Sequence, residues 1–159
     1  MSLQLFKIAS TTVASPVSTI DFTSIPQTYT DLILKVGGEG TGSVILTFNG
    51  SSTGYTFKVL RGTGSVAQGL NNTDYAGTTA WILMANSCSS NSEAYIPNYT
   101  GSTNKMIQSD GVHEANATTA YATLTAGLWS NTAAINSISI GAYQTTLNAN
   151  TTATLYGVL

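Results

Sequence analysis

The stretch TIDFTSIPQTYTDLILKV, residues 19–36, decides the fold. Apolar and polar residues alternate within 19–23, and Leu32, Leu34 and Val36 recur at every second position within 31–36. This period of two is typical of half-buried β-strands. Pro26 lies between the two runs, and proline has no backbone N–H to donate to a central ladder. The stretch therefore predicts two strands that are joined by a bend.

The same alternation continues along the chain. The glycine-rich segment 37–42 predicts a hairpin turn into a strand at 44–48, and a second turn leads to a strand at 55–61. Residues 62–78 are polar and rich in Gly and Asn, which predicts a long loop. The remaining strands are expected at 79–86, 92–99, 105–109, 118–129, 135–140 and 152–159.

Short strands at regular spacing, with turn residues between them, predict an all-β fold, an antiparallel β-sandwich of the jelly-roll type. We expect about nine to eleven strands and no helix. The length of 159 residues suits one domain, 1–159, because no linker of disordered composition divides it. Residues 1–16 are expected to form either an N-terminal arm or the first strand of the sandwich.

The composition argues against charged partners. Charged residues make up 8% of the chain, against about 25% in an ordinary domain. Seven acidic and five basic residues give a net charge of −2 without a basic cluster, so we expect no nucleic acid and no membrane partner. The single cysteine, Cys88, cannot form an internal disulfide, which suits synthesis in a reducing cytoplasm.

Few residues could carry chemistry. His113, with Asp110 and Glu114 beside it, is the only beginning of a metal site, and an exposed polar turn is the simpler interpretation of this cluster. His113 would also have to serve as the base for any serine or cysteine nucleophile, yet no GxSxG segment is present. We therefore expect no catalytic residue, no metal and no cofactor.

Two weaker possibilities remain for these side chains. A carboxylate pair for glycoside cleavage would have to come from Glu39, Glu93 and Glu114. The aromatic side chains Trp81 and Trp129 could stack on a sugar, although core packing explains most aromatics on alternating strands. We expect the chain not to be an enzyme.

Several segments together resemble a family of small virion proteins of tailed bacteriophages, especially phages of cyanobacteria. The resemblance runs from about residue 17 to the end and rests on ordered short blocks, not on one reactive motif. The blocks are TIDFTSIPQTYTDLILKV (19–36), ILTFNGSSTGYTFKVLRGTGS (45–65), YIPNYTGSTNK (95–105), TTAYATLTAGLWSNTAAINSISI (118–140) and TATLYGVL (152–159).

The resemblance implies a capsid cement or decoration protein, made in the host cytoplasm, that binds the major capsid protein on the virion surface. Proteins of this kind are commonly homotrimers. On this interpretation the contact residues are expected to be Leu3, Leu5 and Phe6 of the arm, with Tyr95 and Tyr99 as second contacts. The alternative function is a tail or head-fibre module that binds a host surface glycan through the 62–78 loop.

Overall fold

The computed structural model confirms an all-β antiparallel sandwich. The part of the chain that it describes contains ten β-strands and no helix. The described residues are 4–63, 66–72, 82–114, 120–143 and 145–159, and for 39–42, 63, 70–72 and 82–89 among them only the backbone is described. The strands are β1 Leu5–Thr12, β2 Thr19–Phe22, β3 Asp31–Phe48, β4 Tyr55–Thr63, β5 Val66–Asn72, β6 Ile82–Ile96, β7 Lys105–Glu114, β8 Ala120–Trp129, β9 Ile138–Ala142 and β10 Thr152–Val158.

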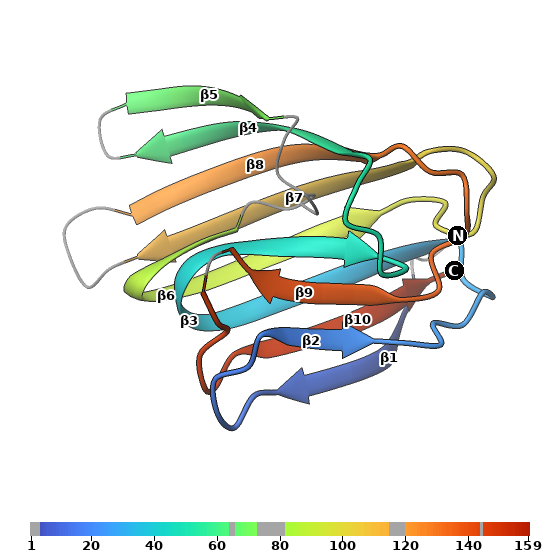
Figure 1. Cartoon of the computed structure of the whole chain (residues 1–159), viewed down its shortest axis with the longest axis horizontal. Helices are drawn as coiled ribbons and strands as arrows, with labels where there is room; N and C mark the ends of the chain where they lie inside the picture. The colour runs from blue at the N-terminus through green and yellow to red at the C-terminus, as the bar shows by residue number, and fades with distance from the viewer. Residues whose placement is uncertain (1–3, 64–65, 73–81, 115–119, 144) are drawn as a thin grey trace.

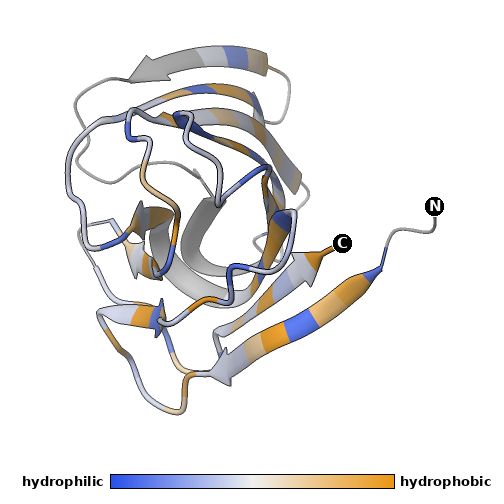
Figure 2. Cartoon of the chain, turned by 90° about the vertical axis from the view of Figure 1, so that its right-hand side faces the viewer, coloured by the Kyte–Doolittle hydropathy of each residue, from blue (hydrophilic) through white to orange (hydrophobic). Residues whose placement is uncertain are grey.

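The strands form one large and one small layer that share β3. The large sheet has the order β1-β10-β3-β6-β7-β8-β4-β5 (Figure 1). In the small layer β2 pairs with β9, and β9 pairs with the second half of β3, from Val44 to Phe48. Seen along the strands, the large sheet curves around the core, with β5 at one extreme and β1 at the other (Figure 2).

The pairing is nested from the ends of the chain inward. β1 pairs with β10, β2 with β9 and β3 with β6, and every one of these pairs is antiparallel. The strands β7, β8, β4 and β5 then extend the large sheet beyond β6. The finer prediction of a jelly roll stays a prediction.

The core fills the space between the two layers. Leu34 and Leu46 of β3, Ile140 of β9 and Leu155 of β10 are buried there, together with Trp129. Trp129 is thus a core residue, as its place on an alternating strand predicts, whereas Trp81 lies outside the described residues. The core holds the large sheet in one shape and so places its edges and its outer face.

The predicted hairpin turn at 37–42 is wrong. β3 runs through this segment, and Gly37 to Gly40 pair with β6. A Cβ at Gly38 would lie 2.7 Å from the Cα of Thr151, so this glycine permits a close approach of two backbones, which is another use of glycine besides turns.

The predicted loop at 62–78 is wrong in its first part, because Val66–Asn72 form β5 and pair with β4. Residues 73–78 lie outside the described part of the chain. The strands predicted at 79–86 and 92–99 are one strand, β6, within the described residues. The Ser and Asn residues between them lack apolar alternation, but their backbones pair with both β3 and β7.

The alternation read in 118–129 is confirmed as strand β8, with an unexpected orientation. Thr123 and Thr125 are buried, while Ala122, Leu124 and Ala126 are exposed. The apolar row of this strand therefore lies on the outer face of the sheet, away from the core.

Candidate docking surface

The N-terminal segment is an edge strand of the large sheet. β1 pairs with β10 from Leu5 to Thr12, with an irregularity in the register between Lys7 and Ala9. Residues 1–16 were expected to form either an N-terminal arm or the first strand of the sandwich. Within Leu5–Thr12 the structure shows the first strand, β1. Among the described strands, β1 pairs only with β10, so its other edge faces no described strand.

Two of the predicted contact residues present apolar surface on this edge strand. Leu5 and Phe6 are 47% and 38% exposed. The ring of Phe6 stacks on Tyr29, with ring centroids 5.9 Å apart. Leu3, the third predicted contact of the segment, lies outside the described residues.

Tyr29 is held over β10 by a glycine. A Cβ at Gly157 would collide with the ring of Tyr29, so any larger residue would displace the ring. Because Phe6 stacks on the same ring, Gly157 indirectly positions Phe6 on the edge of the sheet.

The two tyrosines around Pro97 have opposite environments. Tyr95 is exposed, and its hydroxyl donates a hydrogen bond to Oδ2 of Asp31 at 2.7 Å. This hydrogen bond raises the pKa of Tyr95. Tyr99 is fully buried and donates its hydroxyl to the carbonyl of Pro26. The prediction that Tyr99 contacts a partner is therefore wrong, because its side chain is part of the core.

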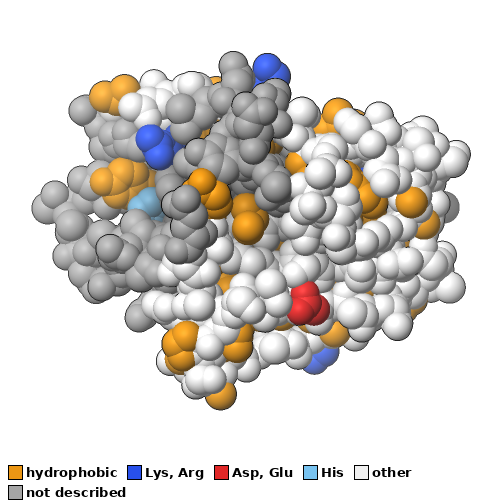
Figure 3. All heavy atoms as spheres, in the orientation of Figure 1, with side chains coloured by type: hydrophobic (Ala, Val, Ile, Leu, Met, Phe, Trp, Pro, Cys, Tyr) orange, Lys and Arg blue, Asp and Glu red, His pale blue; other side chains and the backbone are white. Residues whose placement is uncertain are grey.

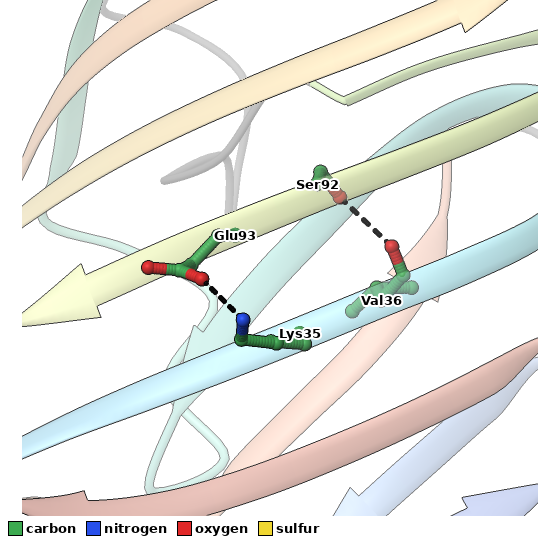
Figure 4. Close-up of polar contacts among 4 residues, drawn as sticks. All are labelled: Lys35, Val36, Ser92 and Glu93. Carbon is green, nitrogen blue, oxygen red and sulfur yellow. Dashed lines mark hydrogen bonds and ion pairs between the residues drawn. The ribbon is translucent and has the colours of Figure 1, made fainter.

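An ion pair lies on the outer side of the sheet between β3 and β6. Nζ of Lys35 lies 2.9 Å from Oε2 of Glu93, directly across the two strands (Figure 4). This contact raises the pKa of Lys35, mainly through the hydrogen bond to Glu93. Since both side chains are about half exposed, we attribute little stability to the pair.

Several exposed apolar side chains of the described residues gather on the outer side of β7, β8 and β4, and we call this surface the outer sheet face. Its exposed side chains are Leu60, Met106, Val112 and Leu124, which are 47% to 64% exposed. Two open hollows of about 480 and 440 Å³ lie on the two sides of Leu124, which lines both. Sequence analysis missed this surface, although the apolar alternation in β8 was its signal.

Charged side chains are sparse on the molecule. On the described part of the surface in Figure 3 they are few and scattered among uncharged ones. The described residues include no helix long and apolar enough to cross a membrane. Binding at such a surface has to rely on shape, apolar contact and backbone pairing.

His113 lies in a strand, and its prediction as part of an exposed polar turn is wrong. β7 continues through Glu114 because β8 pairs with it along its whole length. His113 is buried, and its ring stacks on Tyr121 with centroids 4.5 Å apart. Burial, and secondly the charge of Arg61, lower the pKa of His113.

The candidate metal and acid residues do not converge. Along β7 the side chains of Asp110 and Glu114 are exposed, while His113 is buried on the opposite face. Among the described residues no group of three or more His, Cys, Asp or Glu side chains is placed to hold a metal ion. Cys88 pairs with Gly40 through the backbone, and its side chain is outside the description.

The described glutamates lie too far apart for a glycosidase pair. Glu114 is opposite Ser89 on β6, four residues from Glu93. At about 3.3 Å per residue this is about 13 Å along the strand, whereas catalytic carboxyl pairs lie about 5–9.5 Å apart. The side chain of Glu39 is outside the description.

Acidification is expected to destabilise the fold through His113. Because the pKa of His113 in the fold lies below its usual 6.5, the unfolded chain binds the proton first as the pH falls below 6.5, and stability decreases until the folded chain is protonated too. Denaturant unfolding at a series of pH values measures this. His113→Phe keeps a ring against Tyr121 and should flatten the dependence; an equal loss of stability in both proteins would contradict the prediction.

Comparison of the chain with protein-family models, curated proteins and solved structures finds no match.

Proposed function

We propose that this chain is a virion structural protein of a tailed bacteriophage, and specifically a capsid cement or decoration protein that binds the lattice of the major capsid protein. The observation that carries the proposal is the exposed apolar pair Leu5 and Phe6 on an edge strand of a sandwich. An edge strand with apolar side chains can add its backbone to a neighbouring sheet and bury those side chains there.

The strand pairing supports the fold that the resemblance implies. A jelly roll is a long antiparallel hairpin rolled into two sheets, so its first strand pairs with its last and its second with its next to last. The pairs β1–β10, β2–β9 and β3–β6 follow this order. In this proposal β4 with β5 and β7 with β8 are hairpins added to a jelly-roll body.

The sparse charge supports a docking mechanism that depends little on ionic strength. A net charge of −2 provides little long-range attraction, so affinity would come from buried apolar area at about 25 cal/mol per Å² and from added strand pairing. Many copies on one lattice would then resist the pressure of packaged DNA through many contacts. The chain is proposed to be made in the host cytoplasm and to lie on the capsid surface as a homotrimer.

Replacing Leu5 and Phe6 together by serine is expected to weaken binding to purified capsids by about 100-fold or more, because each buried apolar side chain contributes about 1.5–3 kcal/mol. Co-sedimentation of the chain with capsids of its phage measures this affinity. Val66→Ser on β5 is the control, because Val66 is equally apolar and exposed at the other extreme of the sheet. Unchanged occupancy of the double variant would remove β1 from the contact.

A reconstruction of the virion tests the proposal as a whole. Density for the chain in the symmetry of the capsid lattice is expected. Density on the tail or on a fibre would replace capsid decoration by the alternative function, and a virion without the chain would overturn both.

One observation favours the alternative, a tail or head-fibre module that binds a glycan. Tyr95 is exposed beside the larger hollow of the outer sheet face, and Asp31 fixes its hydroxyl. A fixed aromatic ring is a platform on which a sugar can stack. The loop first assigned to this function is β5 over Val66–Asn72, so the glycan would have to bind near Tyr95. Binding on a glycan array that is lost in Tyr95→Ala would support this candidate.

A further inference from the structure

We propose that one end of the large sheet is an acid-sensitive element, which opens locally at low pH while the rest of the sandwich stays folded. We call it the polar end, and it consists of residues 61–63 of β4, 109–114 of β7 and 120–125 of β8. It lies away from the two chain termini, where these strands extend past β9 (Figure 1). The inference goes beyond capsid binding and does not depend on it.

The inner face of the sheet changes from apolar to polar along β7 and β8. At one end of these strands, Ile107 and Trp129 are buried in the hydrophobic core. Further along, the buried polar side chains of β7, β8 and the neighbouring β6 are Ser109, His113, Thr123, Thr125, Ser90 and Ser92. Because apolar burial is the main favourable term in folding, the polar end is held closed less strongly than the end that contains Trp129.

Buried polar atoms without hydrogen-bond partners weaken the polar end further. In the part of the chain that the structure describes, four buried side-chain nitrogen or oxygen atoms have no partner. Three of them belong to the polar end: Oγ of Ser109, Oγ1 of Thr125 and Nε of Arg61. Ser109 and Thr125 are directly paired across β7 and β8, yet their hydroxyls do not bond to each other. A buried donor without a partner costs free energy, and opening returns these atoms to water.

His113 is the titratable group that links this end to pH. Its ring stacks on Tyr121 of β8, and its backbone pairs with Ser90 of β6. The hydroxyl of Ser90 already donates to the carbonyl of Gly38. The imidazole is therefore enclosed by a ring on one strand and a hydroxyl-bearing residue on the other.

The charges around His113 disfavour its protonation in the closed sheet. Arg61 of β4 is a cation whose charge acts on His113, and its guanidinium donates to the neutral Gln68 of β5. Asp110 and Glu114, the described carboxylates of β7, are exposed on the opposite face of the strand. Protonation would thus place a second cation near Arg61, without a described carboxylate on the same face to neutralise it.

The direction of the pH effect follows from this arrangement. Burial, and secondly the charge of Arg61, lower the pKa of His113 in the closed sheet below 6.5. The open form therefore binds the proton first as the pH falls through 6.5, and acid favours opening. Opening of the polar end leaves Ile107 and Trp129 in place, so it costs less free energy than unfolding of the whole chain.

Amide hydrogen exchange, followed residue by residue by NMR at several low urea concentrations, tests the inference. Amides of 110–114 and 120–123 are expected to be less protected than those of 105–107 and 127–129. Their exchange should respond little to urea, because a local opening exposes little surface. From pH 7 to pH 5, after correction for the intrinsic exchange rate, the equilibrium constant for opening should rise several-fold. A pKa of 6.5 in the open form limits this rise to about 25-fold.

Two variants test the parts played by His113 and Arg61. His113→Phe keeps a ring against Tyr121 and should abolish the rise in opening between pH 7 and pH 5. Arg61→Gln removes the neighbouring cation, so the pKa of His113, measured by NMR titration of its ring, should move toward 6.5 and the rise should become smaller. Lys7→Gln removes a charge of the same sign on β1, outside the polar end, and should change neither quantity.

Two results would overturn the inference. Equal protection and equal urea dependence at the polar end and around Trp129 would mean that the sheet opens only by global unfolding. A rise in opening that persists in His113→Phe would mean that His113 does not control it. Capsid binding at pH 7 is a separate measurement, and its failure would leave the acid response standing.

Discussion

Replacing Trp129 by alanine is expected to lower the free energy of unfolding by about 3–5 kcal/mol, the usual cost of removing a large buried aromatic side chain. Trp129 is 1% exposed. Its ring lies 5.6 Å from that of Phe48 on β3 and 6.0 Å from that of Tyr55 on β4, between centroids. The side chain thus fills the junction between the two layers, and alanine would leave a cavity that the rigid strands cannot close.

Urea unfolding followed by circular dichroism measures the effect of this substitution. Leu124→Ala is the matched control, because Leu124 lies on the same strand with its side chain on the outer face. The control should change the stability of the single copy by less than about 1 kcal/mol. A Trp129→Ala protein as stable as the Leu124→Ala protein would show that Trp129 does not join the layers.

Replacing Lys105 by methionine is expected to lower the free energy of unfolding by about 3 kcal/mol. Lys105 is 1% exposed, and its ammonium donates hydrogen bonds to the carbonyls of Gly101 at 2.7 Å, Thr103 at 2.6 Å and Thr132 at 3.2 Å. Methionine has a similar length but no donor, so the three acceptors lose their partner, at about 1–3 kcal/mol for each carbonyl that water does not reach.

The Lys105→Met substitution also has an opposing effect on the free energy of unfolding. Burial lowers the pKa of the Lys105 ammonium, so the same substitution also removes the cost of placing a cation inside the protein. We expect the lost hydrogen bonds to dominate because three acceptors surround one donor group. Lys7→Met on the exposed side of β1 is the control and should be neutral in the same urea experiment. A stabilised Lys105→Met protein would mean that desolvation of the charge dominates instead.

Local patterns predicted the strands well where apolar residues recur at every second position. The segments 19–23 and 31–36 were correctly assigned to β2 and to the start of β3, and 118–129 to β8. The local patterns failed to predict the strand where only backbone pairing defines it, as in the Gly-rich part of β3 and the Ser-rich part of β6. There the side chains carry no period, and the partners lie about 50 residues away along the chain.

For the candidate contact residues, too, local sequence predicted some features and missed others. Leu5 and Phe6 are exposed on an edge strand, and their contact with a partner stays a prediction, whereas Tyr99 is buried and its assignment was wrong. Tyr95 and Tyr99 each lie two residues from Pro97, on opposite sides of it, and only Tyr95 lies in a strand with an exposed face. The role of Asp31 as the partner of Tyr95 could not be predicted, because β3 and β6 meet only in the folded chain.

By itself, the sequence determined the period of the strands, the sparse charge and the all-β class, because these properties depend on neighbouring residues and on composition alone. Tertiary structure decided which side of each strand is covered. The row Ala122, Leu124 and Ala126 reads as a core face in isolation, yet it is exposed, and Thr123 and Thr125 on the other face are buried instead. A period of two marks two faces but does not say which one meets the core, and only the long-range pairing of β3 with β9 and β6 places the layer that covers one of them.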